Sequence, residues 1–378
     1  MSGREMHYIE DAFLKNQIFP NGANVEAFEE DLKRATGARY VNCLSSGTAA
    51  IHLALIILGV EQGDEVICSS FTFSASANPI VYLKALPIFV DSDRDSWNMS
   101  PALLEAAILD RIKKGKLPKA IIAVDLYGMP ARMDEIMEIA NRYGIPVIED
   151  AAEAIGSKFN GKPCGTFGEM GILSFNGNKA ITTSAGGALV SENKNYYEEA
   201  GFLSTQARDD FPHYEHTEIG YNYRMSNICA AIGRGQMDAF EERILKRRDN
   251  FLFYREAMKD IPGITFLEEP DDRFYSNHWL TTILIDPDKA RGVNPTQVRE
   301  EFALINIETR PLWKPMHLQP VFSECPAYVD GTSEGLFKIG LCLPSSTCIT
   351  DEERQFVVDS LNDIIIQGGK GAGRRDAS

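Results

Sequence analysis

The chain has 378 residues, and its formal net charge at pH 7 is -16. This length is sufficient for a large hydrophobic core and a second, smaller domain. The acidic balance excludes a protein that binds nucleic-acid backbones through a basic surface. It does not exclude a small anionic ligand, because a local group of main-chain amides can bind an anion despite the overall charge.

Apolar and cysteine patterns indicate a cytoplasmic protein without a membrane segment. The longest apolar stretch, residues 49–60, contains His52 and is too short to span a bilayer. Residues 1–13 contain no apolar signal core. The seven cysteines are scattered without a CxxC pair, as expected for reduced thiols. His213 and His216 are not accompanied by a cluster of cysteines or carboxylates with ligand spacing, so we predict no metal site.

From residue 24 to residue 190, apolar strand-like runs alternate with helical patterns. Helical spacing predicts helices at 25–37, with Gly37 as the stop, at 48–60 and at 134–144. Apolar runs that end in polar residues predict buried strands at 39–47, 64–70, 86–93, 120–128 and 145–152. This alternation is typical of the α/β class, with a mostly parallel central sheet and helices on both faces.

The second half of the chain has a different pattern. Residues 225–258 carry one long helical pattern, which we expect to bend near Gly233 and Gly235. Strand-like runs at 278–287 and 339–346 are then followed by a helical pattern at 350–367. We predict a large domain at 1–250, a smaller α+β C-terminal domain at 251–367 and a disordered, glycine-rich tail at 368–378.

Polar residues follow the first predicted strand at the point where a helix begins. Ser45, Ser46, Gly47 and Thr48 would place hydroxyl groups and main-chain N–H groups at that helix start. Such a terminus binds phosphate well, because its N–H groups are unpaired and the helix dipole favours negative charge. The same residue types are common as plain helix caps, so this tetrapeptide alone leaves both interpretations open.

A carboxylate lies at the end of another predicted strand. Asp150 ends the strand at 145–152, with Glu149 beside it and Glu153 three residues further on. Ligands of such sheets bind at the carboxyl ends of the strands, so Asp150 is placed to contact one. Capping of the next helix, or solvation at the rim of the sheet, would explain the residue equally well.

A lysine occupies a polar break between two strand-like runs. The segment SFNGNK contains Ser174, Asn176 and Lys179, and a strand-like run resumes at TTSAGGALVS. A lysine in a desolvated pocket can attack a carbonyl as the free amine. A solvated surface lysine is the ordinary alternative, but the apolar runs on either side of the break argue against it.

These three elements together match what pyridoxal 5′-phosphate (PLP) requires. A lysine forms a Schiff base with the cofactor's aldehyde, and a carboxylate keeps the pyridine nitrogen protonated. Hydroxyl groups and a helix start hold the phosphate. A lysine released by the amino donor is then placed to carry a proton between the substrate carbon and the cofactor. The sequence therefore predicts a PLP-dependent enzyme.

The sequence resembles the DegT/DnrJ/EryC1/StrS family, the PLP-dependent sugar aminotransferases of fold type I. The resemblance covers nearly the whole chain, from about Ile18 to Ile366. It implies the fold type I architecture and an enzyme that moves an amino group from L-glutamate to a keto-sugar linked to a nucleotide diphosphate. The stretches that carry it are residues 25–55, 63–80, 146–190, 220–233 and 307–322.

Carried over by position, the resemblance implies a set of cofactor contacts. Lys179 would bind the aldehyde and Asp150 would pair with the pyridine nitrogen. Phe73 would stack on the ring, although a core phenylalanine is the alternative. Many family members have His or Gln in place of Glu153, which leaves the role of Glu153 open. The residues implied to bind the cofactor are Ser46, Gly47, Thr48, Phe73, Asp150, Glu153, Ser174, Asn176, Lys179 and Asn222.

The same resemblance implies a homodimer and a substrate. Asn222 would contact the phosphate of the partner subunit's cofactor, which makes the dimer part of the active site. SFNGNKAITTS and RPLWKPMH look most like aminotransferases that act on UDP-2-acetamido-2,6-dideoxy-4-ketohexose, with the new amine at C4. Arg310, Trp313 and His317 would line the sugar-nucleotide side, with Arg224 and Tyr223 as further candidates. Alternatively, Trp313 packs the domain junction and Arg310 forms a local ion pair.

Four other functions remain as alternatives at this point. GDP-perosamine synthases and dTDP-keto-sugar aminotransferases share most of these motifs. A PLP-dependent or PMP-dependent sugar dehydratase would have the same fold, but those relatives usually have histidine in place of Lys179. A non-catalytic sensor of a phosphorylated ligand belongs to a different class, although the chain has no evident DNA-binding helix pair or basic patch.

Overall fold

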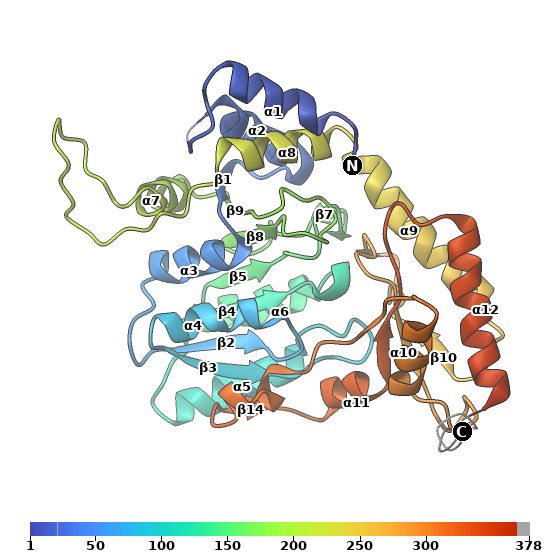
Figure 1. The fold of residues 1–378 in the computed structure, drawn as a ribbon. Coiled ribbons are helices and arrows are strands. Elements are labelled where there is room, and N and C mark those ends of the chain that lie inside the picture. Colours follow the sequence, from blue (N-terminus) through green and yellow to red (C-terminus); the bar gives the residue numbers. More distant parts are fainter. Residues whose placement is uncertain (21, 369–378) are drawn as a thin grey trace, which may run out of the picture.

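The computed structural model describes residues 1–20 and 22–368, and it confirms the α/β class (Figure 1). Its main sheet has eight strands in the order β1-β9-β8-β5-β4-β2-β3-β14. All strands run in the same direction except β9, which pairs antiparallel with both β1 and β8. The strands are β1 (Tyr40–Leu44), β2 (Glu65–Ser69), β3 (Leu86–Val90), β4 (Ala120–Val124), β5 (Val147–Asp150), β8 (Met170–Ser174), β9 (Gly187–Ser191) and β14 (Ala327–Tyr328).

Both faces of this sheet are covered by helices. Successive strand residues point to opposite faces, so in β2 the side chain of Ile67 joins one core cluster while Val66 and Cys68 join the other. Because both faces are buried, the strands read as continuous apolar runs. One face carries α3 (Gly47–Ile57), α4 (Asn78–Tyr82) and α7 (Lys194–Ser204), and the other carries α2 (Ala23–Thr36), α5 (Pro101–Lys113), α6 (Met133–Tyr143) and α8 (Asn227–Met237).

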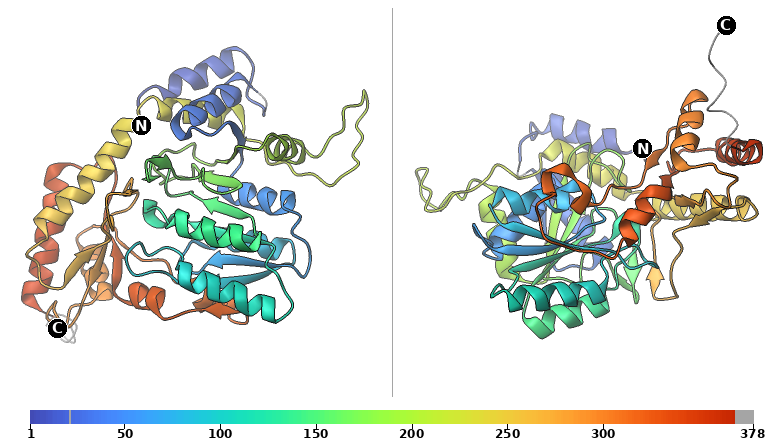
Figure 2. Two further views of the ribbon diagram at one scale, coloured as in Figure 1. Left: turned by 180° about the vertical axis from the view of Figure 1, so that it is seen from behind. Right: turned by 90° about the horizontal axis from the view of Figure 1, so that it is seen from below.

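A second, smaller sheet lies beside the main one, together with the helices α9 and α12 (Figures 1 and 2). Its order is β10-β12-β15-β13, and all of its pairs are antiparallel. A third sheet, β11-β6-β7, joins early and late segments of the chain. The elements are α9 (Phe240–Ala257), β10 (Ile264–Phe266), β12 (Thr282–Ile285), α10 (Pro295–Leu304), β13 (Arg310–Pro311), α11 (Thr332–Ile339), β15 (Gly340–Cys342), α12 (Asp351–Gln367), β6 (Lys158–Phe159), β7 (Lys162–Pro163) and β11 (Phe274–Tyr275).

The predicted bend near Gly233 and Gly235 is wrong in position. The helical pattern forms two helices, α8 and α9, which are separated at residues 238 and 239. Both glycines lie inside unbroken α8, where they permit close packing. A Cβ on Gly233 would lie 2.6 Å from the ring of Phe28, and one on Gly235 would lie 2.7 Å from the main chain of Glu5 in α1 (Glu5–Leu14).

The helix stop at Gly37 is confirmed, because this residue has φ 74° and ends α2. The proposed domain boundary at residue 250 falls within α9 and stays a prediction. Although it comes late in the chain, β14 returns to the main sheet and pairs with β3.

The predicted tail lies outside the described residues, apart from Gly368. Among the helices of the described residues, none is long and apolar enough to cross a membrane.

Candidate active site

A cavity of about 410 Å³ lies at the carboxyl ends of the main-sheet strands. Its walls come from the segments that follow β1, β2, β5 and β8, and from residues near the second sheet. This volume is within the range of small-molecule sites. Ten of the residues predicted from the sequence line it: Ser46, Gly47, Thr48, Phe73, Asp150, Glu153, Ser174, Asn176, Lys179 and Trp313.

The start of α3 forms one wall of the cavity. The hydroxyl group of Ser46 accepts a hydrogen bond from the N–H of Ala49, so this serine does cap the helix. The next residue, Gly47, approaches β8 closely: a Cβ here would lie 3.2 Å from Cβ of Ser174 and 3.6 Å from its hydroxyl oxygen. The helix start therefore presents main-chain N–H groups and the Ser174 hydroxyl to the same space, which suits a phosphate group.

Asp150 is buried at the end of β5. Its Oδ2 accepts a hydrogen bond from the Ser76 hydroxyl (2.7 Å), and its Oδ1 accepts one from the N–H of Ala152 (3.2 Å). Burial raises the pKa of this carboxyl group, and the two hydrogen bonds and the charge of Lys179 act in the opposite direction. A protonated ring nitrogen in the cavity would supply the cation that a buried carboxylate needs.

Lys179 lies between a carboxylate and an aromatic ring. Its Nζ is 3.3 Å from Oε1 of Glu153 and 4.0 Å from the centre of the Trp279 ring. Only 13 % of the lysine side chain is exposed, and Glu153 is buried. Burial raises the pKa of Glu153, whereas the positive charge of Lys179 and the N–H of Tyr127 lower it. The cavity thus holds a largely buried amine beside two carboxyl groups.

Tyr127 connects several of these side chains. Its N–H donates to Oε2 of Glu153 (2.7 Å), and its hydroxyl accepts a hydrogen bond from the N–H of Trp313 (2.8 Å). Its ring is stacked with the rings of both Trp279 and Trp313. The residue has φ 55°, a left-handed conformation that is uncommon for a bulky side chain. Such a conformation persists only where the surrounding structure fixes it.

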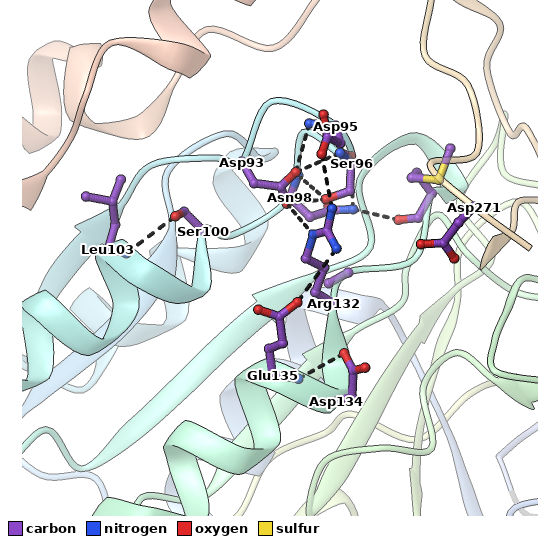
Figure 3. A network of polar contacts seen from close by, with 12 residues as sticks. Asp93, Asp95, Ser96, Asn98, Ser100, Leu103, Arg132, Asp134, Glu135 and Asp271 are labelled. Carbon is purple, nitrogen blue, oxygen red and sulfur yellow. Dashed lines mark hydrogen bonds and ion pairs between the residues drawn. The ribbon is translucent and has the colours of Figure 1, made fainter. Parts of the chain in front are cut away.

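A polar network beneath this segment supplies that support (Figure 3). The side chain of Asn98 accepts a hydrogen bond from the N–H of Leu126 and donates one to the carbonyl of Met129, both at 2.8 Å. These two bonds hold the turn on either side of Tyr127. Figure 3 also shows Arg132, whose guanidinium bonds Asp95 at 3.2 Å and lies near Asp93, which in turn binds the Ser96 loop.

Three predicted residues of the segment 222–224 lie outside this cavity. Asn222 and Arg224 line a different hollow of about 590 Å³, together with residues of the segment 204–214. Arg224 forms an ion pair with Glu29 (3.0 Å) and donates a hydrogen bond to Asn42. The hydroxyl of Tyr223 is 3.2 Å from Nδ1 of His52. Within one chain, therefore, the structure does not bring these residues to Lys179.

Of the substrate residues predicted between 310 and 317, only one lines the cavity. Trp313 lines the cavity and also packs on Tyr127, and its contact with the substrate stays a prediction. Arg310 is 76 % exposed in its side chain and forms a local ion pair with Glu308. His317 lies in a short 3-10 helix, and its Nδ1 is 2.6 Å from the Ser70 hydroxyl. Arg310 and His317 do not line the cavity in this chain.

Sequence reasoning missed three residues of the site: Ser76, Tyr127 and Trp279. Ser76 lies in the predicted matching stretch 63–80, but its bond to Asp150 spans a separation of 74 residues. Tyr127 lies inside the predicted strand 120–128. The observed strand β4 ends at Val124, and Tyr127 falls in the short 3-10 helix after it, Leu126–Gly128, where a strand-end search could have included it. Trp279 comes from the second half of the chain, and no local pattern connects it with Lys179.

One buried group among the described residues has the composition of a metal site. Potential ligand atoms of Asp125, Glu149 and Cys164 all lie within 4.8 Å of one another. Burial raises the pKa of both Asp125 and Cys164, which favours their protonated forms. The two oxygens of Glu149 already accept N–H groups, from Gly165 and Phe167, at 2.7 Å each. We therefore interpret the group as a hydrogen-bonded cluster behind β5.

The fold and the cavity together define a PLP-dependent transferase of fold type I. The residues present fit this cofactor: a helix start with Ser174 for the phosphate, a buried carboxylate for the ring nitrogen and an amine for the aldehyde. Comparisons with known proteins agree. The model of the DegT/DnrJ/EryC1/StrS aminotransferase family matches residues 2–362. The chain belongs to this family, and it is therefore an enzyme rather than a ligand sensor.

Individual relatives span nearly the whole chain. One is the "Putative pyridoxal phosphate-dependent aminotransferase EpsN" of Bacillus subtilis (strain 168), 50% identical over 365 residues, which are 96% of this chain and 93% of EpsN. Another is the GDP-perosamine synthase of Escherichia coli O157:H7, 36% identical over 363 residues and 96% of each chain. The crystal structure of a DegT DnrJ EryC1 StrS aminotransferase from Brucella abortus has a TM-score of 0.89 at 29% identity, covering 96% of this chain and 95% of its own.

Proposed function

We propose that the enzyme transfers an amino group from L-glutamate to C4 of a nucleotide-linked 4-keto-6-deoxy sugar, with UDP-2-acetamido-2,6-dideoxy-4-ketohexose as the substrate. The observation that carries the reaction type is the single cavity that holds Lys179, Asp150 and the start of α3. The choice of sugar rests on the segments SFNGNKAITTS and RPLWKPMH, which resemble those of aminotransferases for that substrate.

When bound, PLP supplies an electron-accepting ring that allows an amino group to leave glutamate and to enter the keto-sugar. Asp150 holds the ring nitrogen in its charged form, and Ser76 fixes the orientation of that carboxylate. Lys179 would hold the cofactor through its amine, and its Nζ would carry protons during amino transfer. Glu153, 3.3 Å away, is placed to hold that Nζ near the cofactor.

The aromatic side of the cavity is the proposed sugar-binding side. Phe73 and Trp313 contact each other, with ring centres 5.2 Å apart, and Phe73 is 49 % exposed. Aromatic rings that are partly exposed in the cavity wall suit the apolar face of a sugar or a base. Arg310 precedes Trp313 by three residues, and its exposed guanidinium is suited to a diphosphate. His317 follows on the same segment, and we propose that both residues contact the substrate.

GDP-linked sugars are the second candidate substrate class, because the Escherichia coli relative at 36% identity is named a GDP-perosamine synthase. The deciding experiment incubates the purified enzyme and L-glutamate with UDP-, GDP- and dTDP-linked 4-keto-6-deoxy sugars and identifies the products by mass spectrometry. We expect amination of the UDP-linked acetamido sugar in preference to the others. Preference for a GDP- or dTDP-linked sugar would contradict the substrate and leave the amino-transfer reaction intact.

We also propose a homodimer whose two active sites are shared. The segment after α7 projects away from the body of the chain (Figures 1 and 2) and exposes apolar side chains, with Tyr214 77% and Ile219 84% exposed. Asn222, at the base of this segment, faces a hollow outside the Lys179 cavity. A second copy of the chain could cover both features.

Subunit mixing tests this dimer. Lys179→Ala and Asn222→Ala should each be weakly active or inactive alone, and each should elute as a dimer. A mixed dimer would contain one intact site, formed by Lys179 of one chain and Asn222 of the other. We therefore expect mixing under exchange conditions to restore amination. No gain in activity from confirmed mixed dimers would contradict the shared site.

A cytoplasmic location is the final part of the proposal. All seven cysteines are free thiols, and four of them are buried. Free thiols are typical of proteins from reducing compartments, where disulfides are rare. Export of the chain into an oxidising compartment, detected by cell fractionation, would contradict this location without affecting the reaction.

A further inference from the structure

Arg247 carries a buried positive charge that no carboxylate neutralises within residues 1–20 and 22–368. It lies in α9, and only 7 % of its surface is exposed. Burial lowers its pKa to about 10, with a contribution from the neighbouring Arg243, so the guanidinium remains charged near neutral pH. A buried charge is costly unless hydrogen bonds compensate it, so its partners indicate why it is there.

The partners of Arg247 are main-chain carbonyl groups from three separate segments. Its Nη1 donates to the carbonyls of Trp279 and Ser345, the latter at 3.3 Å. Its Nη2 donates to the carbonyls of Asn178 and Lys179, both at 3.3 Å. One planar group thus binds the loop that carries the reactive lysine and two segments beside the second sheet.

These bonds converge on the environment of the lysine amine. The indole N–H of Trp279 donates to the carbonyl of Asn178 (2.8 Å), which Arg247 also binds. The amine of Lys179 lies 4.0 Å from the centre of that same indole ring. Arg247 therefore fixes the main chain of Lys179 and the main chain of Trp279, whose ring lies against the lysine amine.

Neighbouring side chains on the same face of α9 do not bind this loop. Asn250 donates to the carbonyl of Ser346 (3.0 Å), and Tyr254 donates to the carbonyl of Pro344 (3.1 Å). Both bonds are explained by attachment of the second sheet to α9. Arg247 makes the corresponding bond to Ser345 and adds the two bonds to Asn178 and Lys179, which attachment of the sheet does not require.

We propose that Arg247 is a positioning residue for amino transfer. It holds the loop of Lys179 and the ring of Trp279 in one arrangement and couples that arrangement to the second sheet. The proposal rests on the role proposed for Lys179 in PLP binding. It concerns the geometry of the loop, however, and that geometry can be measured in the chain without cofactor or sugar.

The test compares Arg247→Met with Tyr254→Phe as a matched control, since both variants lose hydrogen bonds from the same face of α9. Amide hydrogen exchange is measured on peptides that cover residues 175–186. Loss of the charge-assisted hydrogen bonds to Asn178 and Lys179 predicts exchange in this loop that is faster by about tenfold or more in Arg247→Met. Tyr254→Phe should leave the loop unchanged. Arg247→Lys should restore part of the protection, because its ammonium group can still donate.

Two outcomes would overturn the proposal. One is loop exchange in Arg247→Met that equals exchange in Tyr254→Phe. If Arg247→Met does not fold, the comparison uses Arg247→Lys, and exchange equal to that of the control overturns the proposal as well. A separate measurement adds PLP and borohydride and identifies the modified lysine. Modification of another lysine would refute the role of Lys179, whereas the exchange result tests the positioning role of Arg247 by itself.

Discussion

The side chains of Asp150, Glu153 and Lys179 place two carboxyl groups and one amine in the wall of a single cavity. Both carboxyl groups are buried, and burial raises the pKa of each. Small polar neighbours decide the charge of such groups, because one hydrogen bond to a carboxylate favours its ionised form. Ser76 and Tyr127 supply those bonds here, to Asp150 and Glu153 respectively.

Replacement of Ser76 by alanine should weaken PLP binding. The variant loses the hydrogen bond to Oδ2 of Asp150, so the pKa of this carboxyl group rises and its ionised form pairs less well with the ring nitrogen. A hydrogen bond to a charged group is worth about 1.5–3 kcal/mol, which corresponds to a dissociation constant about 10- to 100-fold higher. Fluorescence titration with PLP measures this constant.

Thr72→Val is the control for that experiment. Thr72 bonds the Ser76 hydroxyl (2.8 Å) and does not bond the carboxylate, so its loss should have a smaller effect. Equal affinities of Ser76→Ala and the unsubstituted chain for PLP would show that the serine does not orient Asp150.

Replacement of Tyr127 by phenylalanine should destabilise the chain. The main-chain N–H of Trp313 would lose its acceptor, the hydroxyl of the buried Tyr127, and loss of this part-buried hydrogen bond costs about 0.5–1.5 kcal/mol. Urea unfolding measures the change in the free energy of unfolding. The matched control is Tyr143→Phe, whose hydroxyl bonds Glu105 in a partly exposed position and should contribute less. A larger loss in the control than in Tyr127→Phe would contradict the role of Tyr127.

At the scale of elements, close packing explains features that local sequence cannot. Gly235→Ala would place a Cβ 2.7 Å from the main chain of Glu5, so α1 must shift. Overpacking of this kind costs about 1–3 kcal/mol. Gly335→Ala in α11 meets nothing within 4 Å and should stabilise the chain by about 0.5–1 kcal/mol. Thermal unfolding of the two variants should therefore shift in opposite directions, and shifts of the same sign would contradict the packing.

The pair of acids between β4 and β5 should give the chain a pH-dependent stability. Burial and the charge of Glu149 raise the pKa of Asp125 well above its usual value, so the folded chain keeps a proton that the unfolded chain releases above about pH 4. The contribution of Asp125 to the free energy of unfolding is therefore complete below about pH 4 and declines as the pH rises. Asp125→Asn should therefore gain stability relative to the unsubstituted chain with rising pH, by up to about 1.4 kcal/mol per pH unit.

Glu149→Gln provides the contrast. Its amide has one acceptor oxygen, so the N–H of either Gly165 or Phe167 loses its partner. We expect the lost hydrogen bond to cost about 1–3 kcal/mol. Removal of the charge of Glu149 also lowers the pKa of Asp125, so the stability of this variant should decline less steeply with rising pH than that of the unsubstituted chain. Chemical unfolding at several pH values measures both variants. A difference between Asp125→Asn and the unsubstituted chain that does not change with pH would contradict the raised pKa.

Much of the main sheet could be predicted from the sequence, because strands buried on both faces and amphipathic helices have different apolar periods. Asp150 and Ser174 could be found because they are the last residues of β5 and β8, and Lys179 because it lies in the polar break between β8 and β9. The unbroken course of α8 through Gly233 and Gly235 could not be predicted. These glycines are required by close contacts with Phe28 and Glu5, which lie about 200 residues earlier in the chain. Trp279 was missed for the same reason, because only the folded chain brings it to Lys179.

In the whole molecule, the cavity around Lys179 combines both parts of the chain. The main sheet supplies the start of α3 and the strand ends, while Trp279 precedes β12 and Trp313 follows β13 of the second sheet. The helix α9 joins the parts and carries Arg247, which binds both. Movement of the second sheet would therefore change the surroundings of Lys179 directly.

Chemical trapping of the cofactor tests the central claim most directly. The purified chain is incubated with PLP and reduced with borohydride, and its peptides are then analysed by mass spectrometry. The account predicts a yellow protein that is bleached on reduction, with the phosphopyridoxyl group on Lys179 and no such product in Lys179→Ala. A phosphopyridoxyl group on a different lysine, or on none, would contradict the assignment of this cavity as the active site.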